Sequence, residues 1–417
     1  MLFRISFQPL LLTDDKDRNI RLPVVQYPRG VDGIGLFHKL FRMNAELFEL
    51  RHSLHREPEL SGAEYRTAEI LEYFLKNTKP DRLVTGVGGN GILAVFQGLK
   101  PGIEILLRCD MDAVPVQEEL RADYCSATPG IAHKCGHDGH MAIMAGVASR
   151  LSAAPPEKGR VLLLFQPGEE TGSGARMVIE DRAFEEFHPD LVLALHNLPG
   201  FPAGSVVTAS GPFAEASRGL VARLKGKSSH AGEPLLGISP APAVASLIRG
   251  FEDLCIHDRG ILVTLIHVVI GEPAFGTSPC DAVVMATLRA PTGGQMESLS
   301  DSVLALVSEV SEKNRLEFET EWTEEFPATV NSPEADSLIR DSAANLGLEI
   351  ITLQKPFPWS EDFGHFTGKF GGALFGLGAG IGIPPLHSPM YDFPDQLIDT
   401  GIELFMNMIE RTPGIEE

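Results

Sequence analysis

Short apolar runs and amphipathic helical stretches alternate along most of the chain. Four runs are apolar on both faces and bounded by glycine, proline or charged residues, namely 104–109 (EILLRC), 160–165 (RVLLLF), 190–196 (DLVLALH) and 372–380 (GALFGLGAG). Such runs are typical of buried, mostly parallel strands. Residues 139–154 have helical periodicity, and Asp138 is placed to cap that helix. The alternation predicts an α/β fold with a mostly parallel sheet.

The middle of the chain has a different pattern. Strand-like segments lie at 217–227, 261–271, 282–290 and 316–322, and helix-like segments lie at 241–255 and 296–314. The resulting order β-α-β-β-α-β predicts a small α+β domain with an antiparallel sheet. We expect this domain at residues 213–326. It would be inserted into a larger, discontinuous domain formed by residues 43–212 and 327–417.

The first 42 residues lack the periodicity that begins at Met43, where residues 43–77 predict a helix, a break containing proline and a second helix. We expect residues 1–42 to be an atypical extension, or the product of a start codon assigned too early. A signal peptide is not predicted, because the basic lead, uninterrupted apolar core and small-residue cleavage site are missing. No apolar run is long enough to span a bilayer.

Composition and charge narrow the possible partners. The chain has 417 residues, of which 43% are apolar and 22% charged, as in ordinary globular proteins. A formal net charge of −21 argues against nucleic acid or an anionic membrane as partner, because both require a basic surface. Five cysteines are too few, and odd in number, for a disulfide framework. We therefore expect a reducing, cytoplasmic location with Cys135 as a free thiol or thiolate.

Residues that can bind metals follow four of the predicted strands. Asp110 and Asp112 follow the first, Glu169 and Glu170 follow the second, His196 ends the third and His387 follows the fourth. Ligands of open α/β sheets bind at the carboxyl ends of the strands, so these side chains should meet. The segment 133–140 (HKCGHDGH) adds Cys135 and His137 just before a helix N-terminus.

Each of these signals has a simpler explanation when taken alone. An aspartate after a strand is usually a turn or cap residue, and a single histidine is more often a satisfied surface or core residue than a ligand. Adjacent glutamates are common in solvated loops. A structural zinc site would usually contain Cys-x-x-Cys pairs, which are missing here. The coincidence of all the signals at one sheet edge favours a catalytic metal site.

The residue types suit a hydrolase with two metal ions. Cys135 and His137 lie two apart in a loop containing glycine, and the helix N-terminus would stabilise a thiolate that bridges two ions. Glu170, His196 and His387 would complete two shells that keep open positions for water. Glu169 would then be free to act as general base.

Two aspartates suit supporting roles, and the metal itself is not determined. Asp112 would accept a proton from a ligating imidazole and fix its tautomer, while Asp138 would be a cap or act in the same way. Thiolate and imidazole ligands favour zinc, and the carboxylate and open positions also suit manganese, cobalt or nickel.

Eight motifs in fixed order resemble a known family. They are LRHSLHREPELS, LRCDMDAVP, HKCGHDGHMA, FQPGEETGSGA, ALHNLP, GKSSHAGEP, WSEDFG and PLHSP. In this order they resemble the amidohydrolase branch of the aminoacylase/carboxypeptidase-type dinuclear metallopeptidases, over nearly everything from Met43 onward. That branch includes hippurate hydrolases, N-acetyl-amino-acid deacetylases and auxin-conjugate hydrolases.

The resemblance implies a role for each matching residue. The metal ligands would be Cys135, His137, Glu170, His196 and His387, and Glu169 would be the base. The inserted domain would be a lid and dimerisation domain, which implies a homodimer. In this lid, His230 would steady the oxyanion, often from the partner subunit, and Arg289 is a weaker match for a clamp on the substrate carboxylate.

The sequence departs from the family in the lid. Relatives commonly carry an asparagine where this chain has Gly276, and their GTxR strand end is only approximated by residues 286–290 (ATLRA). Both changes affect the expected recognition of the acyl group. The motif SEDF (Ser360 to Phe363) matches the family near the site, and the sequence assigns it no physical role.

These observations predict an enzyme that hydrolyses the amide bond of N-acyl amino acids to a carboxylic acid and a free amino acid. A dipeptidase or carboxypeptidase on the same scaffold is the nearest alternative. It would need a partner for the free amine of its substrate. A catalytically silent binding or scaffold protein is the third possibility, and the loss of the base or of a ligand would indicate it. Glu169 and all five expected ligands are present.

Overall fold

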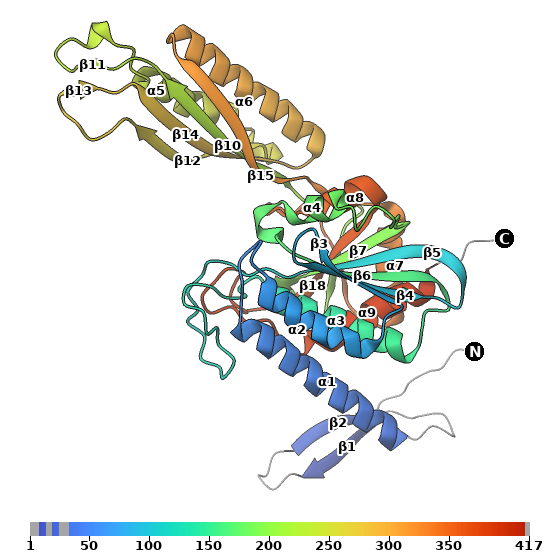
Figure 1. Ribbon diagram of the computed structural model, residues 1–417. Helices are drawn as coiled ribbons and strands as arrows, with labels where there is room; N and C mark the ends of the chain where they lie inside the picture. Colours follow the sequence, from blue (N-terminus) through green and yellow to red (C-terminus); the bar gives the residue numbers. More distant parts are fainter. Residues whose placement is uncertain (1–7, 14–18, 25–32, 413–417) are drawn as a thin grey trace. The chain divides into compact units, whose positions relative to one another are not determined.

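An eight-stranded sheet forms the centre of the larger of two compact units, residues 49–417 (Figure 1). The structure is a computed structural model that describes residues 8–13, 19–24 and 33–412. The strand order is β17-β8-β18-β7-β5-β6-β4-β3. These strands are β3 (Arg82–Val87), β4 (Gly91–Gln97), β5 (Lys100–Asp110), β6 (Lys158–Gln166), β7 (Leu191–Pro199), β8 (Val206–Thr208), β17 (Ile350–Thr352) and β18 (Gly372–Gly380).

The four central strands β18, β7, β5 and β6 run parallel to one another. At one side of them β4 pairs antiparallel with β6 and with β3, and at the other side β8 pairs antiparallel with β18 and parallel with β17. The predicted α/β fold with a mostly parallel sheet is therefore confirmed. All four apolar runs identified in the sequence lie on these central strands. Leu106 and Leu107 point to opposite faces of β5 and are both fully buried, which shows that both faces of the sheet are covered.

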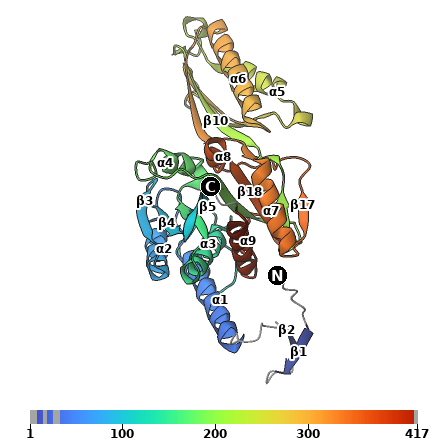
Figure 2. The same cartoon turned by 90° about the vertical axis from the view of Figure 1, so that its right-hand side faces the viewer.

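Helices pack on both faces of this sheet (Figures 1 and 2). The helices α2 (Tyr65–Thr78), α3 (His137–Ala153) and α9 (Leu397–Arg411) lie on one face, and α4 (Gly174–Glu180) and α8 (Gly364–Phe370) lie on the other. A further helix, α7 (Pro333–Asn345), packs against β8 and β18. It begins where the Ser332 side chain accepts a hydrogen bond from Ala335 N and proline occupies the first helical position.

A second, antiparallel sheet follows from residue 216 and has the strand order β12-β14-β10-β15. Its strands are β10 (Ala216–Lys225), β12 (Leu262–Ile270), β14 (Asp281–Ala290) and β15 (Glu317–Phe326), and its helices are α5 (Ala241–Asp253) and α6 (Gly293–Lys313). Side chains along β14 alternate between buried and half-exposed, and the buried ones share a core with both helices. The predicted β-α-β-β-α-β order is found, with one short extra pair, β11 (Ser229–His230) and β13 (Thr277–Ser278).

The chain enters and leaves this insertion through two paired short strands. The segment β9 (Gly211–Ala214) precedes β10, β16 (Thr329–Asn331) follows β15, and the two are antiparallel. The residue boundaries 212/213 and 326/327 remain predictions. We call the inserted part, residues 213–326, the lid from here on.

The smaller compact unit, residues 1–48, contains the antiparallel pair β1 (Gln8–Thr13) and β2 (Asn19–Val24) and the first part of α1 (Gly33–Arg56). The helix begins ten residues before the change of pattern at Met43. The expectation that residues 1–42 are an extension falls partly outside the described residues and stays a prediction. Among the helices of the described ranges, none has both the length and the apolar character needed to cross a membrane.

Candidate metal centre

The carboxyl ends of the central strands bring the predicted ligands together. Asp110 ends β5, the short 3₁₀ turn η1 (Glu169–Thr171) follows β6, His196 lies on β7, and His387 lies in the loop after β18. Among the described residues, three sets built only from the predicted ligands and Glu169 have their ligand atoms within 4.8 Å of one another, and Asp110, His137 and His140 form a fourth set at the same edge. The first three sets are Cys135, His137 and His196; Cys135, Glu170 and His387; and His137, Glu169 and Glu170.

Cys135 belongs to two of these sets. One set contains the buried histidines His137 and His196, and the other contains Glu170 and the half-exposed His387. A sulfur atom shared in this way has the position that a ligand bridging two metal ions needs. All five predicted ligands therefore converge, and their role as ligands remains a proposal.

The ring of His137 is oriented by the segment after β5. Its Nδ1 donates to the backbone oxygen of Asp112 at 2.9 Å, and the Asp112 carboxylate lies 3.5 Å from the same nitrogen. The carboxylate itself accepts bonds from Glu170 N and Ser61 Oγ. Asp112 thus orients His137 mainly through its backbone, and the Nε2 of that ring faces the cluster.

His196 and His140 differ in which nitrogens are free. His196 Nδ1 donates to the backbone oxygen of Asn197 at 2.9 Å, which leaves Nε2 directed at Cys135 Sγ, 3.5 Å away. His140 donates from Nδ1 to Asp110 Oδ1 at 2.6 Å and accepts at Nε2 from Asn197 N. Both nitrogens of His140 are engaged, so this histidine supports the site and is not a free ligand.

The buried polar atoms of the cluster fit a divalent cation. His137 Nε2 and Glu170 Oε1 are buried, and neither has a hydrogen-bond partner among the described residues. Glu170 Oε1 lies 3.8 Å from His137 Nε2 and 3.6 Å from His387 Nε2. Burial lowers the pKa of His137, but the charges of Asp110, Asp112 and Glu170 outweigh it and raise the pKa to about 10. Thiol, imidazole and carboxylate donors in a site that attracts positive charge suit zinc or a related ion.

The thiol of Cys135 has a raised pKa in the absence of metal. The sequence predicted that the N-terminus of α3 would stabilise a thiolate. Burial raises the pKa of Cys135 well above its ordinary value, and the charges of Glu170, Glu169 and Asp110 add to this rise. The partial charge of a helix end is too small to offset three carboxylates. Without a cation this thiol stays protonated, so metal binding would release its proton. A thiolate bound to metal ions stays a prediction.

Glu169 lies next to the predicted ligands His137 and Glu170 and also belongs to a group of three carboxylates. Its ligand oxygen is within 4.8 Å of those of Glu361 and Asp362, all three buried. Burial raises the pKa of Glu169 well above its ordinary value, and the charges of Glu361 and Glu170 raise it further. A carboxylate with a raised pKa is a stronger base, as proton transfer at neutral pH requires.

A buried arginine balances these carboxylates. Arg108 on β5 is 1% exposed and contacts Asp110 Oδ2, Glu361 Oε1 and Asp362 Oδ1, each at 2.7 Å. Its Nε donates to Gln166 Oε1 at 2.8 Å. The SEDF motif, which had no assigned role, thus supplies two acidic partners to one cation beside Glu169.

The loop before α3 depends on Gly136, which separates Cys135 from His137. Gly136 has a φ of +97°, and a Cβ added there would lie 2.4 Å from Asn197 Oδ1. We expect Gly136→Ala to lower the free energy of unfolding by about 1–3 kcal/mol and to lose bound metal. Urea unfolding and metal analysis of the purified variant measure both effects.

Gly130→Ala is the matched control for this substitution. Gly130 has a φ of +77°, but a Cβ added there would meet no atom within 4 Å. It therefore carries the backbone strain without the collision and should keep its metal. Equal metal content in the two variants would contradict the expectation for Gly136.

Asp138 does not cap α3, contrary to the sequence prediction. The N-cap is Gly136, and Asp138 lies buried in the first turn. Its carboxylate accepts a bond from His55 Nδ1 at 2.8 Å and lies 3.5 Å from Arg51 Nη1. Burial lowers the pKa of His55, but Asp138 and Glu118 outweigh it and raise the pKa to about 9. Asp138 is thus the anionic partner of buried cations.

His230 lies in the lid and belongs to none of the candidate metal groups found in the described residues. It is exposed on β11, and its Nδ1 accepts a bond from Gly232 N at 3.0 Å. This bond places the proton of a neutral ring on Nε2, where it could be donated to a substrate oxygen. A Cβ added at the nearby Gly276 would meet no atom within 4 Å, so a side chain can begin at this position without a collision.

Arg289 is already engaged by the catalytic part of the chain. Its Nη1 donates to Pro358 O at 2.8 Å and to Ser360 Oγ at 3.2 Å. These contacts hold the residues just before the two acidic members of SEDF. A further role as a clamp on a substrate carboxylate stays a prediction.

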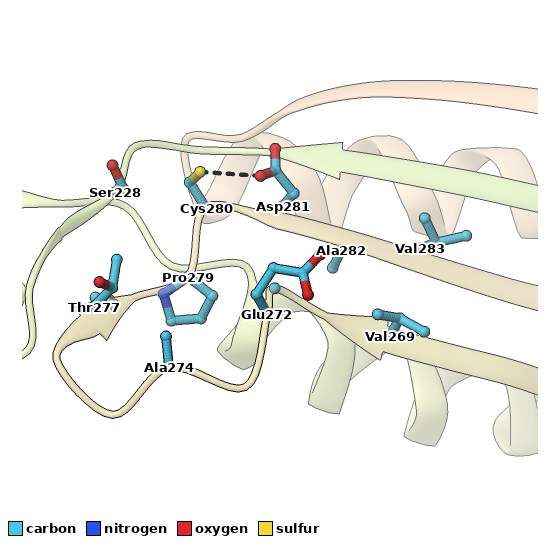
Figure 3. Close-up of a pocket in the computed structure, with 12 residues that line it drawn as sticks. Ser228, Val269, Glu272, Ala274, Thr277, Pro279, Cys280, Asp281, Ala282 and Val283 are labelled. Carbon is cyan, nitrogen blue, oxygen red and sulfur yellow. Dashed lines mark hydrogen bonds between the residues drawn. The ribbon is translucent and has the colours of Figure 1, made fainter.

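A surface pocket of about 380 Å³ lies at one end of the lid (Figure 3). Cys280 donates a hydrogen bond from Sγ to Asp281 Oδ2 at 3.1 Å, and Thr277 and Pro279 form part of the lining. The lining includes none of the predicted metal ligands. The candidate site is therefore the side-chain cluster at the sheet edge and not this pocket.

Comparison with known proteins agrees with this geometry. Residues 106–411 match the model of peptidase family M20/M25/M40. The chain belongs to this family. The family expected from the eight motifs is thereby confirmed.

Several known proteins are similar to this chain over most of their length. The chain is 31% identical to N-acetyl-L-cysteine deacetylase of Bacillus subtilis (strain 168), over 81% of this chain and 82% of that protein. It is 29% identical to N-acetyldiaminopimelate deacetylase of Geobacillus sp. (strain WCH70), over 86% of this chain and 96% of that protein. The fold is similar to that of the Bacillus subtilis YXEP protein, described as a dinuclear metal binding peptidase, with a TM-score of 0.76. The two sequences are 24% identical, and the match covers 89% of this chain and 98% of that chain.

Sequence reasoning assigned no role to several residues that support this M20-family site, although the quoted motifs contain them. Arg108 could have been noticed as a charged residue inside an otherwise apolar strand. His140 repeats the histidine spacing of HKCGHDGH, and Asp110 was noticed without a role. Arg51 and His55 lie on α1 within the motif LRHSLHREPELS, but that motif is more than 70 residues from Asp138, and local pattern does not indicate their contact with it.

Proposed function

We propose that this protein hydrolyses the amide bond of N-acyl amino acids with the help of two divalent metal ions. The observation that carries the proposal is the convergence of Cys135, His137, Glu170, His196 and His387 around unpartnered buried donor atoms, with Glu169 beside them. Family membership and the relatives named as deacetylases of N-acetylated amino acids support it.

In this proposal Cys135, His137 and His196 hold one ion, and Cys135, Glu170 and His387 hold the other. Bound ions would polarise the scissile carbonyl and lower the pKa of a water molecule between them. Zinc is the ion that the thiol and imidazole donors favour, and manganese, cobalt and nickel also fit.

Glu169 moves the proton in the reaction. Its carboxylate accepts a proton from the attacking water and passes it to the leaving nitrogen, which departs as the amine of the amino acid. Arg108, Glu361 and Asp362 hold the segment around this carboxylate. His230 donates from Nε2 to the oxyanion once the lid brings it to the substrate.

The proposal is tested by turnover of a substrate panel containing N-acetyl, N-benzoyl and long-chain N-acyl amino acids and unblocked dipeptides. We expect turnover of acylated substrates, loss of activity after dialysis against EDTA, and recovery on adding Zn²⁺, Mn²⁺, Co²⁺ or Ni²⁺. Turnover of dipeptides alone would replace the proposal with a dipeptidase. Two bound metal ions without turnover of any substrate would favour the silent scaffold.

We further propose a cytoplasmic homodimer formed through the lid. β12 is an edge strand of the lid sheet, and Ile266 on it is 58% exposed, with Leu265 39% exposed. An apolar edge strand is suited to pairing with a second copy. Light scattering should give twice the chain mass of 45.2 kDa, and Ile266→Lys should shift it toward one chain. A single-chain mass for the unaltered protein would contradict the dimer.

A further inference from the structure

The loop that carries His387 has an unusual conformation. It runs from Ile381 to Gln396, between β18 and α9, and we call it the His387 loop. His387 has a φ of +62°, in the left-handed region that side chains other than glycine rarely adopt. Its side chain is 52% exposed, whereas His137 and His196 are buried. Packing around the ring therefore does not hold this ligand in place.

Two fully buried cations hold the His387 loop instead. Arg51 Nη1 donates to Asp392 Oδ1 and to the backbone oxygen of Phe393, both at 2.8 Å, and Arg51 Nε lies 2.9 Å from Asp395 Oδ1. Lys134 Nζ donates to the backbone oxygen of Tyr391 at 2.7 Å. Neither side chain has any exposed surface.

The backbone of Lys134 fixes His387 directly. His387 N donates to the oxygen of Lys134 at 2.7 Å. Lys134 is the neighbour of Cys135, so the bond joins the segments of two predicted ligands. Lys134 therefore contacts both ends of the turn from His387 to Tyr391. Its backbone oxygen accepts from His387 N, and its Nζ donates to the backbone oxygen of Tyr391.

The same cations also contact the start of α3. Arg51 lies 3.5 Å from Asp138, the neighbour of His137. His55 joins Asp138 to Glu118 through two contacts of 2.8 Å, and Glu118 in turn contacts Lys134. These contacts form a continuous series from Arg51 through Asp138, His55 and Glu118 to Lys134. The series connects the His387 loop to the segment bearing Cys135 and His137.

We propose that Arg51 and Lys134 are positioning residues that set the affinity of the metal position shared by Cys135, Glu170 and His387. The inference rests on the proposed metal site. A half-exposed ligand on a loop must be ordered before it binds. The two cations order the loop during folding, so metal binding does not bear the loss of conformational entropy. The position built from His137 and His196 has buried ligands and therefore depends less on this support.

The test is a zinc titration against a chromophoric chelator, starting from metal-free protein. The unaltered protein should bind two ions. Arg51→Met should bind one ion about 10–100-fold more weakly, as for loss of a group that orients a ligand, and the other ion with a much smaller change in affinity. Arg51→Lys keeps the charge and should recover part of the affinity. His387→Ala serves as the reference for loss of the same position.

Two further variants keep the test decisive. Asp395→Asn removes the negative charge that faces Arg51 Nε and His52 Nε2 from the loop side. It should weaken the same position even where Arg51→Met fails to fold. Arg82→Met, which removes an exposed arginine paired with Glu186, is the matched control and should bind both ions normally.

The outcomes separate this inference from the proposed function. Two unchanged affinities in Arg51→Met and Asp395→Asn would overturn the positioning role. Equal weakening of both positions would also overturn it, because a general structural defect has no preference for one ion. An unaltered protein that binds no zinc would instead overturn the proposed metal site itself.

Discussion

Replacing Glu169 with glutamine is expected to lower kcat about 10²–10⁴-fold while two metal ions stay bound. Glutamine has the shape of glutamate but cannot accept the proton of the attacking water. Glu169 is buried and lies beside Glu170, so the variant separates proton transfer from metal binding. Steady-state kinetics on an N-acyl amino acid, together with metal analysis of the same sample, measure both quantities.

The same substitution, Glu169→Gln, should raise the free energy of unfolding of the metal-free protein although it lowers kcat. The pKa of Glu169 is raised in the folded state, so above its unfolded value the ionised group costs folding free energy. Glutamine removes this cost. At neutral pH the metal-free Glu169→Gln variant should therefore unfold at higher urea than the unaltered protein. The difference should shrink as the pH falls toward the ordinary pKa of glutamate.

Two glutamates provide the controls for this experiment. Glu170→Gln alters a predicted ligand and should lose metal together with activity. Glu180→Gln changes an exposed residue at the end of α4 and should leave both unchanged. Full activity of Glu169→Gln would remove the general base from the mechanism.

Replacing Arg108 with methionine is expected to lower the free energy of unfolding by about 3–5 kcal/mol. The arginine is buried and contacts Asp110, Glu361 and Asp362, each at 2.7 Å. Methionine fills much of the volume but leaves three buried carboxylates without a cation. Removing one partner of a buried charge cluster costs more than the cluster contributes as a whole, because the remaining charges stay desolvated.

Urea unfolding at neutral pH measures this loss. Arg82→Met is the matched control, because Arg82 pairs with Glu186 on the surface and its loss should cost about 0–1 kcal/mol. A loss for Arg108→Met no larger than that of the control would show that the carboxylates are balanced in another way. Acidification should narrow the gap between Arg108→Met and the unaltered protein, because the unpaired carboxylates can then take up protons.

The sequence alone determined the family, the fold class and the set of candidate ligands. Strands such as residues 160–165 are recognised because burial on both faces leaves a continuous apolar run, which is a local property. The acidic and histidine residues directly after those runs identify the sheet edge, because parallel strands end on the same side. Both inferences need only the pattern of neighbouring residues.

Tertiary structure decided how those residues are supported and charged. Arg51 reaches Asp392, 341 positions along the chain, and Arg108 reaches Asp362, 254 positions along. Hydrogen bonds between such distant residues leave no periodic signal in the sequence. The raised pKa of the Cys135 thiol likewise depends on burial and on carboxylates that arrive from other strands. Local pattern therefore predicted which residues meet, and long-range packing determined what each of them can do there.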